Sequence, residues 1–178
     1  MRRAFLDSRK QKGLRVGVNV SASQICMHDF VDKVQAIAKE TDIDPSRVEL
    51  EITEGLLLGQ DSEIRQSLER LRSLGFRIVL DDFGTSYSSL GYLRHYPIDK
   101  IKIDRVFVRN MGPNAKYDAI VSAIVGMTRA LDIELMAEGV ESEIRHARLA
   151  AAGYSDFQGF LFAKPMPLEV LLAELDQT

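Results

Sequence analysis

The sequence predicts an α/β protein in which parallel strands are joined by helices. Three observations predict this fold class: about six apolar, strand-like segments alternate with amphipathic helical segments, the connecting loops are short, and several strands end on polar residues. Two arrangements fit the alternation, an open doubly wound sheet and a (β/α)₈ barrel. No Gly-x-Gly-x-x-Gly segment follows a strand, so the dinucleotide-binding form of the open sheet has no support.

The chain begins with a basic helical segment, residues 2–12, which Gly13 ends. A valine-rich alternation predicts a strand over 14–20, and apolar residues at helical spacing predict a helix over 30–40. Asp44-Pro45 then indicates a turn. The first unit therefore consists of one strand followed by one helix.

The next two strands carry the most distinctive residues. The segment 47–53 alternates as a strand, and an amphipathic helix is expected over 61–74, with Gly75 as its stop. The strand over 76–82 contains the run Ile-Val-Leu, which is typical of a strand buried on both faces. It ends on two adjacent aspartates, which are costly to bury unless a cation meets them.

The second half of the chain repeats the same alternation. A short helix is expected over 88–95, ending before Pro97. The remaining predicted elements, in chain order, are a strand over 100–104, a helix over 115–131, a strand over 133–137, a helix over 143–152, a strand over 156–162 and a helix from Leu168. We therefore expect about six β/α units in one domain.

Composition limits the classes of function. The net charge of −3 argues against broad electrostatic binding to DNA or other nucleic acid. The single cysteine, Cys26, fits a reducing compartment, and the N-terminus lacks the apolar run of a signal peptide. No stretch is apolar for long enough to form a membrane segment. A cytoplasmic enzyme or binding protein is the expectation.

Polar residues gather at the carboxyl ends of the predicted strands, which in a barrel all face one mouth. These residues are Asn19, Glu51, Asp81, Asp82, Lys102, Glu138 and Gln158. Oxygen ligands without histidine or cysteine suit Mg²⁺ or Mn²⁺. Adjacent aspartates can serve two metal ions, which is the layout for in-line attack on a phosphodiester. Lys102, between Ile101 and Ile103, is expected to point into the barrel or toward an anion.

The motifs resemble those of the EAL domain, the bacterial cyclic di-GMP phosphodiesterase family. The matching segments are VNVSA at 18–22, ELEITE at 49–54, LDDFGTSYSSL at 80–90, KIDR at 102–105, AEGVE at 137–141 and QGFLF at 158–162. They cover nearly the whole chain in order, so residues 1–178 are expected to form a single EAL-type domain. The resemblance implies a TIM-type barrel, here incomplete, comprising the C-terminal three quarters of the family barrel.

The resemblance also implies roles for individual residues in the hydrolysis of cyclic di-GMP to linear pGpG. Metal ligands would be Asn19, Glu51, Asp81, Asp82 and Glu138, and catalytic residues would be Glu138, Lys102 and Asp82. Substrate-binding or supporting residues would be Gln158, Glu141 and Glu54, the last anchoring the loop after Asp82. The cofactor would be Mg²⁺ or Mn²⁺ in a two-metal site.

The sequence departs from the family pattern in two places. The Glu-Ala-Leu strand that supplies a further metal ligand is not in this chain, so activity is expected to be impaired. Ser86 stands where the family usually has glycine, which strains the loop if that position needs positive φ. The alternative is an inactive module that binds cyclic di-GMP or another protein. A homodimer or higher oligomer, and an upstream sensor or GGDEF domain in a longer parent protein, are also expected.

Overall fold

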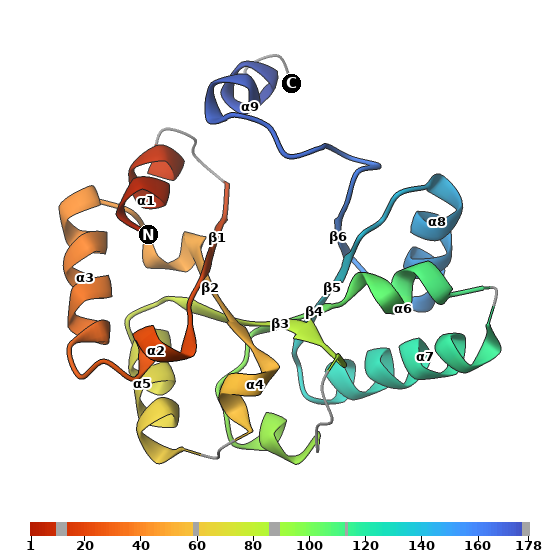
Figure 1. Cartoon of the computed structure of the whole chain (residues 1–178), viewed down its shortest axis with the longest axis horizontal. Helices are drawn as coiled ribbons and strands as arrows, with labels where there is room; N and C mark the ends of the chain where they lie inside the picture. Colours follow the sequence, from red (N-terminus) through yellow and green to blue (C-terminus); the bar gives the residue numbers. More distant parts are fainter. Residues whose placement is uncertain (10–13, 59–60, 86–89, 113, 176–178) are drawn as a thin grey trace.

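The computed structural model describes residues 1–9, 14–58, 61–85, 90–112 and 114–175. Within these ranges the chain forms one parallel sheet of six strands in the order β1-β2-β3-β4-β5-β6. Strands that follow one another in sequence are neighbours in space, which is the order of a barrel wall. A doubly wound sheet would reverse its strand order near the middle. The structure therefore decides between the two arrangements in favour of a half-barrel (Figure 1).

The strands and helices follow the sequence pattern closely. The strands are β1 (Val16–Asn19), β2 (Val48–Thr53), β3 (Arg77–Phe83), β4 (Lys100–Ile103), β5 (Glu134–Glu138) and β6 (Asp156–Gln158). The longer helices are α1 (Arg2–Arg9), α3 (Phe30–Thr41), α5 (Ser62–Ser73), α7 (Ala115–Ala130), α8 (Glu143–Ala152) and α9 (Leu168–Leu175). Shorter elements are α2 (Ala22–Ile25), η1 (Pro45–Arg47), α4 (Glu54–Leu57), η2 (Leu90–Arg94) and α6 (Arg105–Asn110).

The two faces of the sheet differ because strand residues alternate in direction. One set of strand residues is apolar and joins the core beneath the helices; it includes Leu50, Ile52, Ile78, Leu80, Ile101 and Ile103. Each is at most 1% exposed, and burying one such side chain contributes about 1.5–3 kcal/mol. Figure 1 shows α3, α5, α7 and α8 on the outer side of the wall. The intervening residues, such as Lys100 and Lys102, therefore face the interior of the half-barrel.

The last strand is shorter than the sequence predicts. The expected strand over 156–162 ends at Gln158, because the chain turns at Gly159. A Cβ atom at Gly159 would lie 2.1 Å from the Val140 carbonyl oxygen, so only glycine allows this close approach. The Val140 N–H donates to the Gln158 carbonyl at 3.1 Å, and the Leu161 N–H donates to the Val140 carbonyl at 3.0 Å. These bonds take the chain out of the sheet.

Two predicted helices, over 88–95 and over 2–12, differ from the structure or extend beyond the residues that it describes. The predicted helix over 88–95 is a 3₁₀ helix where the structure describes it, over Leu90–Arg94. Ser86, and the expectation of strain there, lie outside the described residues, as do residues 10–13 at the end of the first predicted helix. The one-turn helices α2, α4 and α6 were not predicted, because four to six residues are too few for a periodic pattern.

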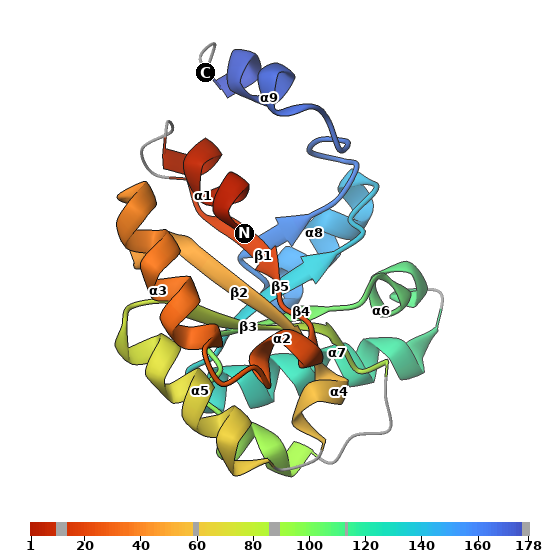
Figure 2. The same cartoon turned by 60° about the vertical axis from the view of Figure 1, so that its left-hand side comes forward.

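The half-barrel has two sheet edges, β1 and β6, which are not paired with each other in the described part of the chain. From β6 an extended segment leads to α9, which stands apart from the wall in both views (Figures 1 and 2). None of the helices that the structure describes is long and apolar enough to cross a membrane.

Because the six strands are parallel and adjacent, their carboxyl ends lie along one curved rim of the wall.

Candidate metal centre

Lys102 lies at the centre of a group of carboxylates on the inner face of the wall. Its Nζ lies 2.6 Å from Glu138 Oε1, 3.3 Å from Glu51 Oε2 and 3.3 Å from Asp81 Oδ1. These partners come from three strands, β5, β2 and β3, and Lys102 itself comes from β4. Lys102 is only 5% exposed. We call Glu51, Asp81, Asp82, Lys102 and Glu138 the upper cluster.

The surroundings of Lys102 keep its ammonium charged. Burial alone would lower the pKa of Lys102, but the hydrogen bond to Glu138 and the charges of the neighbouring carboxylates raise it above its usual value. Burial raises the pKa of Glu138, and the charges of the nearby aspartates add to this effect. Burial is also the largest cause of the raised pKa of Glu51. The acids hold their protons more tightly than usual because they repel one another in a partly dry site.

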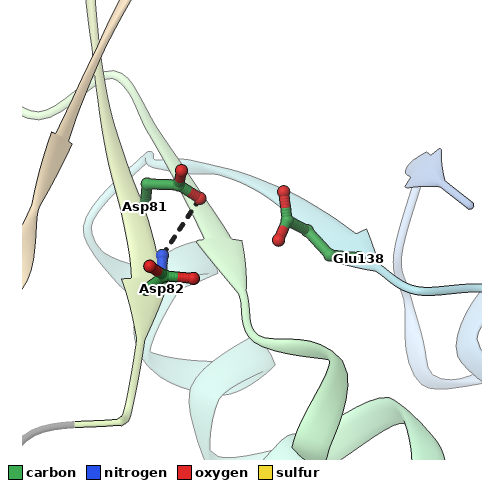
Figure 3. Close-up of side chains that lie close together, drawn as sticks. All are labelled: Asp81, Asp82 and Glu138. Atoms are coloured by element: carbon green, nitrogen blue, oxygen red, sulfur yellow. Dashed lines mark hydrogen bonds between the residues drawn. The ribbon is translucent and has the colours of Figure 1, made fainter. Parts of the chain in front are cut away.

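Asp81 and Asp82 both reach the upper cluster, although neighbours in a regular strand point to opposite faces. The pairing of β3 with β4 shifts register between Leu80 and Phe83, and Asp82 has a φ of 53°. This left-handed residue within a bulge breaks the alternation. The Asp82 N–H donates to Asp81 Oδ1 at 3.0 Å, as Figure 3 shows. A strained backbone thus brings two adjacent carboxylates to one place.

The carboxylates of Asp81, Asp82 and Glu138 converge. One oxygen from each lies within 4.8 Å of the other two, and Figure 3 shows Glu138 extending from β5 toward the aspartates. Burial and the charge of Asp81 raise the pKa of Asp82. Hard divalent cations such as Mg²⁺ are held by carboxylate oxygens of this kind. The donor set therefore fits a divalent metal ion.

A second group of charges lies nearer the amino ends of the strands. Lys100 is 2% exposed, and its Nζ lies 2.9 Å from both Glu49 Oε1 and Asp156 Oδ2. Arg77 pairs with Glu134 at 2.6 Å, and Arg15 lies 3.6 Å from Glu49. The members of this lower cluster are Arg15, Glu49, Arg77, Lys100, Glu134 and Asp156.

Charge balance separates the two clusters. The lower cluster has three cationic and three anionic side chains, so its formal charge is zero. The upper cluster has four carboxylates and one ammonium, a formal charge of −4 + 1 = −3. Carboxylates gathered this closely in a partly buried site repel one another unless cations join them. The upper cluster is therefore suited to metal ions, and the lower cluster is a self-compensated part of the wall.

The lower cluster contains none of the site residues predicted from the motifs. The alternation of side-chain direction along a strand could have predicted this cluster. Glu49 precedes Glu51 by two residues, and Lys100 precedes Lys102 by two residues. Residues two apart on a strand share a face, so Lys100 is expected to face the interior as Lys102 does. Of the two lysines, only Lys102 belongs to a motif, the segment KIDR at 102–105.

Of the other predicted site residues, Asn19 and Gln158 lie beside members of the upper cluster, while Glu141 and Glu54 have partners elsewhere. Strand register places Asn19 opposite Glu51, and Gln158 opposite Glu138. Glu141 pairs with Arg109 at 2.9 Å and with Arg145 at 3.6 Å, and the hydrogen bond from Arg109 lowers its pKa. Both Asn19 and Gln158 are exposed at the rim.

Glu54 lies just past β2, at the start of α4, and is 2% exposed. Its Oε1 accepts a hydrogen bond of 2.7 Å from the Tyr92 hydroxyl in η2. The segment that joins Asp82 to η2 includes residues 86–89, which lie outside the described residues. Glu54 thus ties the end of β2 to the element that follows this segment.

We expect Tyr92→Phe to lower the free energy of unfolding by about 1–3 kcal/mol, because it removes a hydrogen bond to a buried carboxylate. Urea denaturation measures the change. Tyr154→Phe is the matched control: its buried hydroxyl has no hydrogen-bond partner among the described residues. An equal loss in both variants would contradict the assignment.

A cavity of ≈480 Å³ lies at the opposite end of the strands from the upper cluster. Its lining includes Arg72 and Asp99, which pair at 2.9 Å, and Arg77 and Glu134, which pair at 2.6 Å. These arginines are already neutralised by acids. The cavity therefore has no charge excess to attract a ligand, unlike the upper cluster.

The fold and the site define a parallel half-barrel with an acidic, lysine-centred cluster at the carboxyl ends of its strands. The chain belongs to the EAL domain family, because the family model described as EAL domain matches residues 1–165. This membership confirms the resemblance seen in the motifs.

Relatives and solved structures agree with the family. The cyclic di-GMP phosphodiesterase PdeR of Escherichia coli K12 is 40% identical over 154 residues, 86% of this chain and 23% of PdeR. The structure of the EAL domain of Mycobacterium smegmatis DcpA is 35% identical, with a TM-score of 0.92, and covers 99% of this chain and 82% of that chain. A Klebsiella pneumoniae BlrP1 complex with manganese and cy-diGMP is 30% identical, with a TM-score of 0.86, covering 92% and 43%. The chain thus spans about a quarter of the length of PdeR.

Proposed function

We propose that this chain carries most of the catalytic site of a phosphodiesterase that hydrolyses cyclic di-GMP to linear pGpG with Mg²⁺ or Mn²⁺. The observation that carries the proposal is the formal charge of −3 on the upper cluster, gathered around one buried lysine. PdeR is named a cyclic di-GMP phosphodiesterase, and the BlrP1 structure is a complex with manganese and the cyclic dinucleotide; both support the same activity for this chain.

In this proposal the residues that hold the metal ions are Asn19, Glu51, Asp81, Asp82 and Glu138. When bound, the metal ions would neutralise the phosphate and make hydroxide available near neutral pH. Two adjacent acids, Asp81 and Asp82, can serve two ions because the bulge turns both carboxylates to the same side. Glu141 would support the rim through Arg109, and Gln158 would contact the substrate from the end of β6.

Lys102 and Glu138 would perform the chemistry that the protein itself supplies. The Lys102 ammonium would hold a phosphate oxygen as a point charge, and its raised pKa keeps it protonated. Glu138, whose pKa burial raises, would accept a proton from the attacking water at its carboxylate. The water oxygen would bond to phosphorus as the bond to the ribose 3′ oxygen breaks. The 3′ oxygen would take up a proton and leave as a hydroxyl, and the linear dinucleotide would keep a 5′-phosphate.

A hydrolysis assay on cyclic di-GMP tests the proposal, using this chain and a version extended upstream by its own gene sequence. We expect the extended chain to form pGpG with Mg²⁺ or Mn²⁺. We expect this formation of pGpG to stop when EDTA removes the metal. This chain alone should be slower, because the resemblance places a further glutamate ligand upstream. An extended chain that is folded but inactive with both metals would contradict the proposal.

A second candidate is binding without turnover, in which this chain pairs with a second copy. The observation that favours it is the pair of sheet edges, β1 and β6, which are not paired with each other in the described part of the chain. An exposed strand edge can add a strand from another chain. Sizing in solution tests the pairing, since a stable monomer would contradict it. Calorimetry with cyclic di-GMP would then distinguish ligand binding from protein interaction alone.

The proposed setting of the chain is a cytoplasmic signalling protein with a sensor or GGDEF domain upstream, acting on a dinucleotide rather than on DNA. The low proportion of PdeR that the chain covers, 23%, supports further domains in such proteins. Sequencing the gene upstream of Met1 tests this setting directly. A stop codon in the same reading frame, immediately upstream of Met1, would contradict it.

A further inference from the structure

Gly17 lies in β1 directly beneath the carboxylate of Glu51. Strand register pairs Gly17 with Glu49 and Asn19 with Glu51, so Gly17 is on the inner face, one step below the upper cluster. A Cβ atom at Gly17 would lie 2.3 Å from Glu51 Oε1 and 3.0 Å from Glu51 Cδ. The space that a side chain would fill is therefore occupied by the Glu51 carboxylate.

The two oxygens of Glu51 have different surroundings. Oε2 lies 3.3 Å from Lys102 Nζ, and Oε1 lies over the backbone of Gly17. With its carboxylate in this position, Glu51 can form the ion pair with Lys102. A shift of the carboxylate toward Asp81 is opposed by like charge, because Asp81 Oδ1 already lies 3.3 Å from the same Lys102 Nζ. A shift away from the wall would break the contact with Lys102.

We infer that Gly17 is a positioning residue: it holds open the space that lets the Glu51 carboxylate lie beside Lys102 at the proposed metal site. The inference rests on the proposed function for the role of Glu51 as a ligand. The packing itself does not depend on that function. A methyl group at position 17 would force Glu51 either toward the other acids or out of the cluster, and both moves weaken the site.

Gly17→Ala tests the inference, with Gly126→Ala as the matched control. Gly126 is in α7, and a Cβ there would meet nothing within 4 Å. We expect Gly17→Ala to raise the dissociation constant for Mn²⁺ about tenfold, as changes beside a metal ligand do. Gly126→Ala should leave the constant unchanged. Calorimetric titration with Mn²⁺ measures both, and an unchanged constant in Gly17→Ala would overturn the inference.

A second measurement needs no metal. We expect Gly17→Ala to lower the melting temperature of the metal-free protein by about 2–4 °C. In a Glu51→Ala background the same change should no longer lower the melting temperature, because the atoms that it meets are gone. An equal loss in both backgrounds would indicate a general strand effect and overturn the inference. If the wild-type chain binds no Mn²⁺, the proposed metal site fails, while this comparison still tests Gly17.

Discussion

Replacing Asp81 by asparagine is expected to lower the rate of cyclic di-GMP hydrolysis by the upstream-extended chain about 1,000-fold, or about 4 kcal/mol in activation free energy. Asp81 contacts Lys102, accepts the Asp82 N–H and converges with Asp82 and Glu138. Asparagine has the same shape, so the fold should be kept while one negative charge is lost. The rate of pGpG formation with saturating Mn²⁺ measures the effect.

Asp132→Asn is the control for this variant. Asp132 is exposed and lies beside the cavity at the opposite end of the strands, with a φ of 56° that asparagine also adopts. Its replacement removes the same charge and should leave the rate unchanged. Equal rates for the two variants would show that Asp81 does not belong to the reacting site.

Replacing Lys100 by methionine is expected to lower the free energy of unfolding by about 3–5 kcal/mol. Lys100 is 2% exposed and lies 2.9 Å from both Glu49 and Asp156. Methionine fills a similar volume, but Glu49, which is 7% exposed, then lacks its nearest cation. A buried carboxylate without that partner is the main cost. Urea denaturation followed by circular dichroism measures the change.

Arg15→Met removes a charge of the same sign from the same cluster. Arg15 is 48% exposed, and both of its ion pairs are 3.6 Å long. We therefore expect a loss below about 1 kcal/mol. If Lys100→Met cost no more than Arg15→Met, the lower cluster would not be the buried, self-compensated network described above.

Much of the fold could be predicted because each strand and helix carries a local signal. The run Ile78-Val79-Leu80 is fully buried, and the helix over 143–152 has the predicted bounds. The neighbouring order of the strands could not be read from alternation, since barrels and doubly wound sheets share it. The end of β6 depended on a contact between Gly159 and Val140, which is distant in sequence.

Some features of the candidate site could likewise be predicted from the sequence, and others could not. Among the polar strand ends, Glu51, Asp81 and Glu138 meet at Lys102, which lies on the inner face as its place between two isoleucines indicated. Asn19 and Gln158 are placed only by strand register, beside Glu51 and Glu138. The positive φ of Asp82 was not predictable, because no local pattern requires a bulge at that residue. The balance of charge between the two clusters also needed coordinates, since it depends on which of two lysines faces which acids.

The most direct test of the metal site compares two glutamates on one strand by calorimetric titration with Mn²⁺. Glu138 belongs to the upper cluster and Glu134 to the lower one, and both are on β5. We expect the wild-type chain and Glu134→Gln to bind Mn²⁺ with the same affinity, and Glu138→Gln to bind at least about tenfold more weakly. Failure of the wild-type chain to bind, or equal affinity of the two variants, would contradict the assignment of the upper cluster as a metal centre.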